Sequence, residues 1–310
     1  MAKNALSIDS QPSLAKKRGA VIKFLDRLFR EKPLGAFGAV IFLIMLLTGF
    51  LANFLAPYGY NEINPLEMLK APSSQYWLGT DALGRDVLSR IIYGARISMI
   101  VGFAATTISI LISVLIGITT GFFGGKYDLI MQRLVDSWMV FPGLVVLIVA
   151  ISITGPGLWN IVFILGLTYG IAGSRIIRGA TLSTKEEIYV HASNAIGASS
   201  SRQLFRHILP NIMAPIIILF TTRLAAVILS EATMSFLGLG VPPPTPSWGG
   251  MLHEARGYML QVPLLSIWPG VALTLAIYGI NVFGDALRDL LDPRLRGGLG
   301  SYSDNIAKST

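Results

Sequence analysis

The chain has 310 residues, of which 53% are hydrophobic and only 14% charged, and its mean hydropathy is +0.62. A soluble domain carries roughly 25% charged residues, so this composition excludes an ordinary soluble globular protein. The formal net charge of +8 comes without a basic patch interleaved with aromatic residues, which argues against nucleic acid as a partner. Because the chain has no cysteine, disulfides, thiolate metal sites and cysteine nucleophiles are excluded as well.

Long runs with few or no charges predict membrane-spanning helices. The run 137–174 would measure about 57 Å as one helix, nearly twice the hydrocarbon core, so it must fold back at the turn residues 154–157. Only helices satisfy their own backbone in lipid. We therefore predict an all-α polytopic membrane protein with six transmembrane helices. The runs cover residues 34–55, 97–125, 137–174, 209–239 and 257–284.

Lysine and arginine set the expected orientation. Nineteen of them fall on the side of the two termini and five on the other side, and positive charge stays in the cytoplasm. Both termini are therefore expected in the cytoplasm. The predicted divisions are a cytoplasmic tail 1–33, a first transmembrane helix 34–56, an extracytoplasmic segment 57–96, a five-helix core 97–290 containing a cytoplasmic loop 185–210, and a cytoplasmic tail 291–310.

The extracytoplasmic segment contains charges of alternating sign at helical spacing, namely Asp81, Arg85, Asp86 and Arg90. This pattern predicts an amphipathic helix on the outer surface. Such a helix is either solvated at the membrane interface or a docking surface for a binding protein, and the pattern does not separate the two.

Only one expected span, the fifth, contains charges. Arg223 and Glu231 are eight residues apart, about 12 Å along a helix and roughly 80° around it, so they are not expected to pair. Glu231 is either an interfacial carboxylate or a functional group. Arg223 is expected to face another subunit, a water-filled path or a backbone carbonyl. So few intramembrane charges argue against a secondary carrier driven by an ion gradient.

Signals for catalysis are weak. The Gly124-Gly125-Lys126 stretch has Thr120 where a phosphate-binding loop needs glycine, and Tyr127 where it needs serine or threonine. The three histidines show no metal-binding spacing, and no nucleophile elbow is present. We expect no catalytic, metal or cofactor site in this chain.

A polar stretch, "EEIYVHASNAIGASSSRQLFRHILPN", runs from residue 186 to 211. Thr184 and Glu187 match a capping box that would start a helix near Lys185, and Gly197 can end it in a left-handed cap. Ser200 and Gln203 repeat the capping pattern for a second helix. The apolar stripes of the two helices contain Ile188, Ala192, Ala195 and Ile196 in the first, and Leu204, Phe205, Ile208 and Leu209 in the second.

Helices of about ten residues are marginal alone in water, so these stripes need a surface to pack on. Residue pattern alone leaves two alternatives open, this chain's own cytoplasmic surface or another protein.

The stretch resembles the cytoplasmic coupling loop of ATP-binding cassette (ABC) importer permeases. Ala192 and Ser193 hold its small positions, Gly197 its glycine, and Leu209-Pro210 follow at the right distance. His191 stands where that motif has glutamate, and Ser193 and His207 also depart from it.

Four further segments resemble the shorter of the two sister subunits of the dipeptide, oligopeptide and nickel permeases, so the likeness extends from about residue 32 to 297. They are "YWLGTDALGRDVLSRIIYGARIS", "GGKYDLIMQRLVDSWMVFP", "SFLGLGVPPPTPSWGGML" and "FGDALRDLLDPRLRG".

The resemblance implies a type I importer permease fold in a bacterial or archaeal inner membrane, surrounded by lipid. It implies a sister permease, two cytoplasmic ATPases that bind ATP and Mg, and an extracytoplasmic solute-binding protein. The substrate would be a short peptide, with nickel, glutathione or a sugar-derived solute as alternatives, and a membrane scaffold as a further class. The ATPases would contact Tyr189, His191, Ala192, Ser193, Gly197, Ala198, Ser199, Arg202, Phe205, Leu209 and Pro210.

Overall fold

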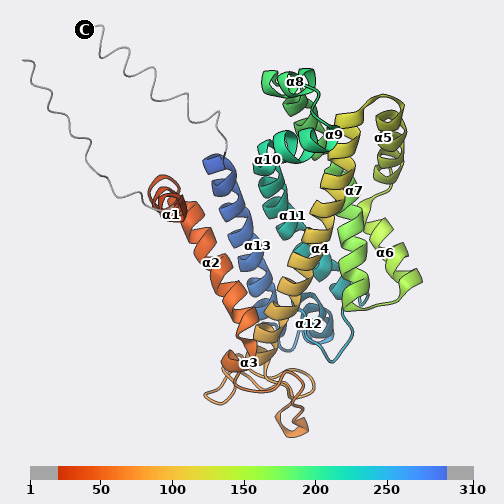
Figure 1. Ribbon diagram of the computed structural model, residues 1–310. Coiled ribbons are helices and arrows are strands. Elements are labelled where there is room, and N and C mark those ends of the chain that lie inside the picture. Colours follow the sequence, from red (N-terminus) through yellow and green to blue (C-terminus); the bar gives the residue numbers. More distant parts are fainter. Residues whose placement is uncertain (1–19, 292–310) are drawn as a thin grey trace, which may run out of the picture.

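The computed structural model describes residues 20–291, and the regular structure in this range is helical (Figure 1). Five helices are long and apolar enough to cross a membrane. A sixth span is completed by α5 (Gly125–Met139) and α6 (Gly143–Thr154), which meet at an angle of 86°. The prediction of an all-α polytopic protein is confirmed. The five long helices are α2 (Pro33–Phe50), α4 (Val87–Phe123), α7 (Leu158–Lys185), α11 (Met213–Phe236) and α13 (Leu264–Leu291).

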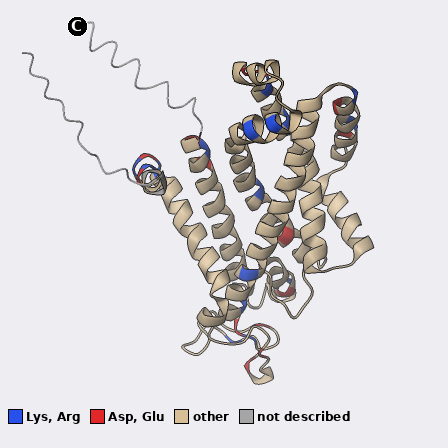
Figure 2. Ribbon diagram, viewed as in Figure 1, with Lys and Arg blue, Asp and Glu red and all other residues tan. Residues whose placement is uncertain are grey.

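Charged residues gather at the two ends of the helical bundle, and its middle is almost free of them (Figure 2). We call one end the α8 end, after helix α8 (Ile188–Ala195), and the other the α12 end, after α12 (Trp248–Ala255). An uncharged band flanked by charged ends is the pattern of a multi-pass membrane protein. The expected tail 1–33 is described only from residue 20, and the expected tail 291–310 lies outside the described residues except for Leu291.

Helices α4 and α7 pack together along most of their length because glycines let their backbones approach. A Cβ atom on Gly117 would lie 2.6 Å from the Ser174 carbonyl oxygen, and one on Gly170 would lie 2.7 Å from the Ile112 Cβ atom. Gly117 is followed by Gly121, and Gly166 by Gly170, so each helix shows the four-residue spacing of small residues that favours close helix pairs in membranes.

The pair α2 and α13 forms a second closely packed unit, on the side of the bundle opposite α5 and α6 (Figure 1). A Cβ atom on Gly38 would lie 2.9 Å from the Gly279 carbonyl oxygen. Helix α1 (Ala20–Glu31) buries Leu28 against Ala286 of α13. Phe24 packs against the same cluster, whereas Ile22, Leu25 and Phe29 are exposed, as expected for a helix at a membrane interface.

The boundaries of the spans differ from the sequence prediction in two places. The second span begins at Val87 rather than at residue 97, because Asp86 caps α4 by accepting a hydrogen bond from the Ser89 amide at 2.8 Å. The third span is a broken helix, with Pro142 at the N-cap of α6. The expected hairpin turn is confirmed, since α6 ends at Gly155 in the left-handed region with φ of +83°.

The amphipathic surface helix expected over residues 81–90 was wrong. Residues 81–86 form a turn outside any helix, and the side chains of Arg85 and Arg90 are buried at the α12 end. Both guanidiniums pair with Asp81, at 2.7 and 2.9 Å, and with Glu254 of α12, at 2.8 and 3.0 Å. Asp86 lies outside this network and accepts hydrogen bonds from Ser89. Because Asp81, Arg85, Asp86 and Arg90 are all buried, they do not form an exposed docking surface.

Candidate functional site

The polar stretch after α7 folds into a compact loop at the α8 end, outside the bundle (Figure 1). Helix α7 continues to Lys185, so the expected capping box does not form, and Glu187 takes the N-cap of α8 without a side-chain bond. The helical segments of the second half are α9 (Ser200–Arg202), the π-helix η2 (Gln203–Ile208) and α10 (Leu209–Asn211).

Gly197 ends α8 in the left-handed conformation, with φ of +78°, as the sequence predicted. The Ala198 amide donates to the Ser193 carbonyl at 3.1 Å, and the Gly197 amide donates to the Asn194 carbonyl at 2.9 Å. This pair of bonds is the Schellman motif, which satisfies the last carbonyls of a helix. The chain therefore reverses at a fixed angle after α8.

The second half of the loop is tied to the first. Ser199, one residue before the expected cap, accepts the Arg202 amide at 3.4 Å. The Gln203 side chain donates to the Asn194 side-chain oxygen at 3.2 Å and to the Ala198 carbonyl at 2.9 Å. These bonds hold α8 and η2 as one rigid unit.

One face of this unit is anchored on the bundle. Val190 and Ser193 of α8 are buried, as is Gln203. Ile208 is fully buried in an apolar cluster with residues of α4, α7 and α11, including Ile118, Ile177 and Ile216. The loop unit is therefore packed directly against these three spans.

The opposite face is apolar and exposed. Ile188 is 85% exposed, Ile196 84% and Phe205 69%. The first stripe thus turns away from the bundle, whereas Leu204, Ile208 and Leu209 of the second stripe pack on this chain's own surface. In the rest of the predicted contact set, Ala198 and Leu209 are half-buried. The exposed members are Tyr189, His191, Ala192, Gly197, Ser199, Arg202 and Pro210.

Glu231 is fully buried between helices of the bundle rather than exposed to solvent. It accepts hydrogen bonds from the hydroxyls of Ser235, at 2.7 Å, and Ser98, at 3.4 Å. The Ser98 bond links α11 to α4. Sequence spacing could not reveal this partner, because it lies on another span.

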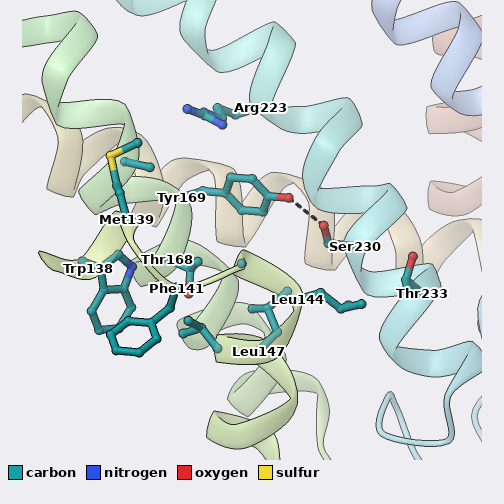
Figure 3. A pocket seen from close by; sticks show the side chains of 13 residues that line it. Trp138, Met139, Phe141, Leu144, Leu147, Thr168, Tyr169, Arg223, Ser230 and Thr233 are labelled. Carbon is teal, nitrogen blue, oxygen red and sulfur yellow. Dashed lines mark hydrogen bonds between the residues drawn. The ribbon is translucent and has the colours of Figure 1, made fainter. Parts of the chain in front are cut away.

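Arg223 lines a cavity of about 380 Å³ enclosed by α5, α6, α7 and α11 (Figure 3). Its guanidinium carbon lies 5.3 Å from the centre of the Tyr169 ring, and the Tyr169 hydroxyl is 2.7 Å from the Ser230 hydroxyl. The Arg223 Nε atom is buried and has no hydrogen-bond partner within residues 20–291. Among the alternatives, the geometry favours a cavity over a backbone carbonyl.

A bundle of apolar spans with an exposed apolar loop packed against three of them defines a multi-pass membrane protein with a candidate protein-contact site. Residues 113–297 match the family described as "Binding-protein-dependent transport system inner membrane component", and residues 27–72 match the N-terminal TM domain of oligopeptide transport permease C. The chain belongs to this family of ABC importer permeases, as its sequence indicated.

Characterised relatives agree. The chain is 38% identical over 287 residues to the oligopeptide transport system permease protein OppC of Bacillus subtilis, covering 93% of this chain and 92% of that one. It is 36% identical over 267 residues to the dipeptide transport system permease protein DppC of Alkalihalophilus pseudofirmus, covering 86% and 88%. It is 37% identical over 275 residues to the glutathione transport system permease protein GsiD of Pectobacterium atrosepticum, covering 88% and 91%.

A solved structure shares the fold. A chain of the inward-facing MetNI methionine ABC transporter superposes with a TM-score of 0.52 and 17% sequence identity, covering 66% of this chain and 96% of that chain. At this identity the likeness concerns the fold alone.

Proposed function

We propose that this chain forms half of the translocation pathway of an importer for short peptides in a bacterial or archaeal inner membrane. A sister permease completes the pathway, two cytoplasmic ATPases bind ATP and Mg, and an extracytoplasmic binding protein delivers the peptide. The chain itself binds no nucleotide and catalyses no reaction. The peptide substrate is supported by the names of the OppC and DppC relatives.

The observation that carries this proposal is the exposed apolar face of the loop unit. Ile188, Ile196 and Phe205 are large apolar side chains held in water on a rigid support, an arrangement that marks a protein contact site. The opposite face is fixed to the bundle through Ile208. The unit therefore has one face for an ATPase and one for the spans. Closure of the ATPases moves the loop, and the loop moves α4, α7 and α11.

The test is transport by the complex purified from its native membrane and reconstituted in liposomes with its binding protein. We expect uptake of a labelled dipeptide that requires ATP and Mg on the side of the liposome membrane where the ATPases lie. Labelled glutathione and nickel serve as parallel substrates. Uptake driven by an ion gradient without ATP would contradict the importer, and ATP-driven uptake of glutathione or nickel but no dipeptide would replace the substrate.

A further inference from the structure

We propose that the cavity between α5, α6, α7 and α11 is a subsite for the C-terminal carboxylate of the transported peptide, with Arg223 as its ligand. This inference rests on the proposed function and names a residue that would bind the transported peptide. Arg96 of α4 also lines a cavity, of about 600 Å³, but its guanidinium already donates to the Gly49 and Phe50 carbonyls and to the Asn53 side chain.

The first argument is charge. Arg223 lies ten residues from the start of α11, about 15 Å along the helix, which is near the middle of the span. An arginine side chain stays protonated in proteins. A cation at this depth is costly unless it meets an anion, water or a carbonyl group. Within residues 20–291, neither an ion pair nor a hydrogen bond of Arg223 is found, and no aspartate or glutamate lines the cavity.

The second argument is orientation. The Tyr169 ring supports the guanidinium at 5.3 Å, and the bond between the Tyr169 and Ser230 hydroxyls fixes the ring between α7 and α11 (Figure 3). This contact uses no N–H donor of the guanidinium, and the Arg223 Nε atom has no hydrogen-bond partner within residues 20–291. The N–H donors of a guanidinium form a planar fork, which binds a carboxylate through two parallel hydrogen bonds.

The third argument is the rest of the lining. Apart from Arg223, the cavity wall offers the hydroxyls of a few residues, of which Thr168 Oγ1 has no partner within the described chain. Trp138, Phe141 and Leu144 supply a broad apolar surface (Figure 3). Such a wall can contact peptide side chains of varied shape without selecting among them. Recognition by Arg223 therefore depends on the C-terminal carboxylate, which every short peptide with a free C-terminus carries.

The experiment compares a dipeptide with its C-terminal amide. Two readouts are measured on the reconstituted complex: ATP-driven uptake, and protection of a Thr233→Cys reporter in the cavity from maleimide by millimolar peptide without the binding protein. Labelling of this chain is read by mass spectrometry. Arg223→Gln removes the charge, Arg223→Lys keeps it without the fork, and Arg30→Gln on α1, distant from the cavity, is the matched control.

We expect the free acid, and not the amide, to protect the reporter in the otherwise unmodified complex, and Arg223→Gln to abolish this protection. Uptake of the free acid should fall at least about tenfold in Arg223→Gln, uptake of the amide should change less than twofold, and Arg223→Lys should be intermediate. Because the same binding protein serves all variants, its own preference cancels between them.

Equal losses for acid and amide, with no protection by either, would mean that Arg223 pairs with an acidic group of the sister permease, and would overturn the inference. Unchanged preference for the free acid in Arg223→Gln would also overturn it. If the unmodified complex transports no peptide at all, the proposed function fails instead, and the two failures are thus distinguished.

Discussion

The Arg90 guanidinium at the start of α4 lies 3.0 Å from the Glu254 carboxylate of α12, although 164 residues separate them in the sequence. Arg90 also pairs with Asp81 at 2.9 Å, and its side chain is only 2% exposed. Burial raises the pKa of the Glu254 carboxyl above its ordinary value, and Arg85 opposes that rise. The arginines thus make it possible to bury Asp81 and Glu254 at the α12 end.

Replacing Arg90 by methionine should therefore destabilise the protein by about 3 kcal/mol, because two partly buried carboxylates lose a partner. The thermal unfolding midpoint of the purified complex in detergent measures the effect. Arg256→Met, at an exposed position near Glu254, is the control and should leave the midpoint unchanged. Equal midpoints for the two variants would show that the ion network contributes nothing to stability.

Gly197→Asp should leave the chain in the membrane but weaken its hold on the ATPases and abolish uptake. The left-handed φ costs a side chain there roughly 1 kcal/mol, and no atom of this chain lies within 4 Å of the Cβ position. A large effect must then come from a partner fitted closely against the loop. Co-purification of the ATPases and peptide uptake are the measurements.

Gly125→Asp is the matched control for that variant. Gly125 also has a positive φ, of +59°, and nothing within 4 Å of its Cβ position, but it lies outside the loop, at the start of α5. The backbone strain in Gly125→Asp is similar, so this variant should still bind the ATPases and take up peptide. Normal uptake with fully occupied ATPases in Gly197→Asp would refute the role of the loop.

Gly117→Ile should separate α4 from α7, since even the first carbon of a side chain would lie 2.6 Å from the Ser174 carbonyl oxygen. Overpacking of this kind typically costs about 1–3 kcal/mol. We expect less folded protein in the membrane and a lower unfolding midpoint. Gly179→Ile on α7 has open space around its Cβ position and should behave normally. If both variants lost similar amounts of folded protein and unfolding midpoint, the cause would be the glycine-to-isoleucine change in a helix rather than close packing of α4 and α7.

The orientation in the membrane is testable because the chain has no cysteine. Ser200 lies at the α8 end and Trp159 at the start of α7, toward the other end of the bundle (Figure 1). In intact cells, an impermeant thiol reagent should label Trp159→Cys, and it should label Ser200→Cys only after the membrane is opened. The reverse pattern would invert the topology derived from the positive charges.

Composition and spacing were sufficient for the parts of the fold that depend on neighbours in sequence. Uncharged runs predicted the spans, and the turn at Gly155 was visible because glycine and proline interrupt an apolar run. The left-handed state of Gly197 was predicted on the same grounds. Each of these features is decided by residues that are close together in the sequence.

Features that depend on distant partners were missed or misjudged. The charges at 81–90 seemed to mark a surface helix because Glu254, which neutralises Arg85 and Arg90, is far away in sequence. The burial of Glu231 was not predicted because its partner Ser98 lies on another span. The cavity at Arg223 needs four helices and the bend between α5 and α6, and no periodicity encodes that angle.

The length of α4 has a mechanical consequence. Its 37 residues make a rod of about 55 Å, against a hydrocarbon core of about 30 Å. One end of the rod is clamped by Arg90 to the α12 end, and the other lies beside the α7 segment that continues into the loop. An unbroken helix this long does not absorb displacement by bending at a joint. In the proposed function, a tilt of α4 at the α8 end therefore carries α12 with it at the opposite face of the membrane, because Arg90 joins the two helices.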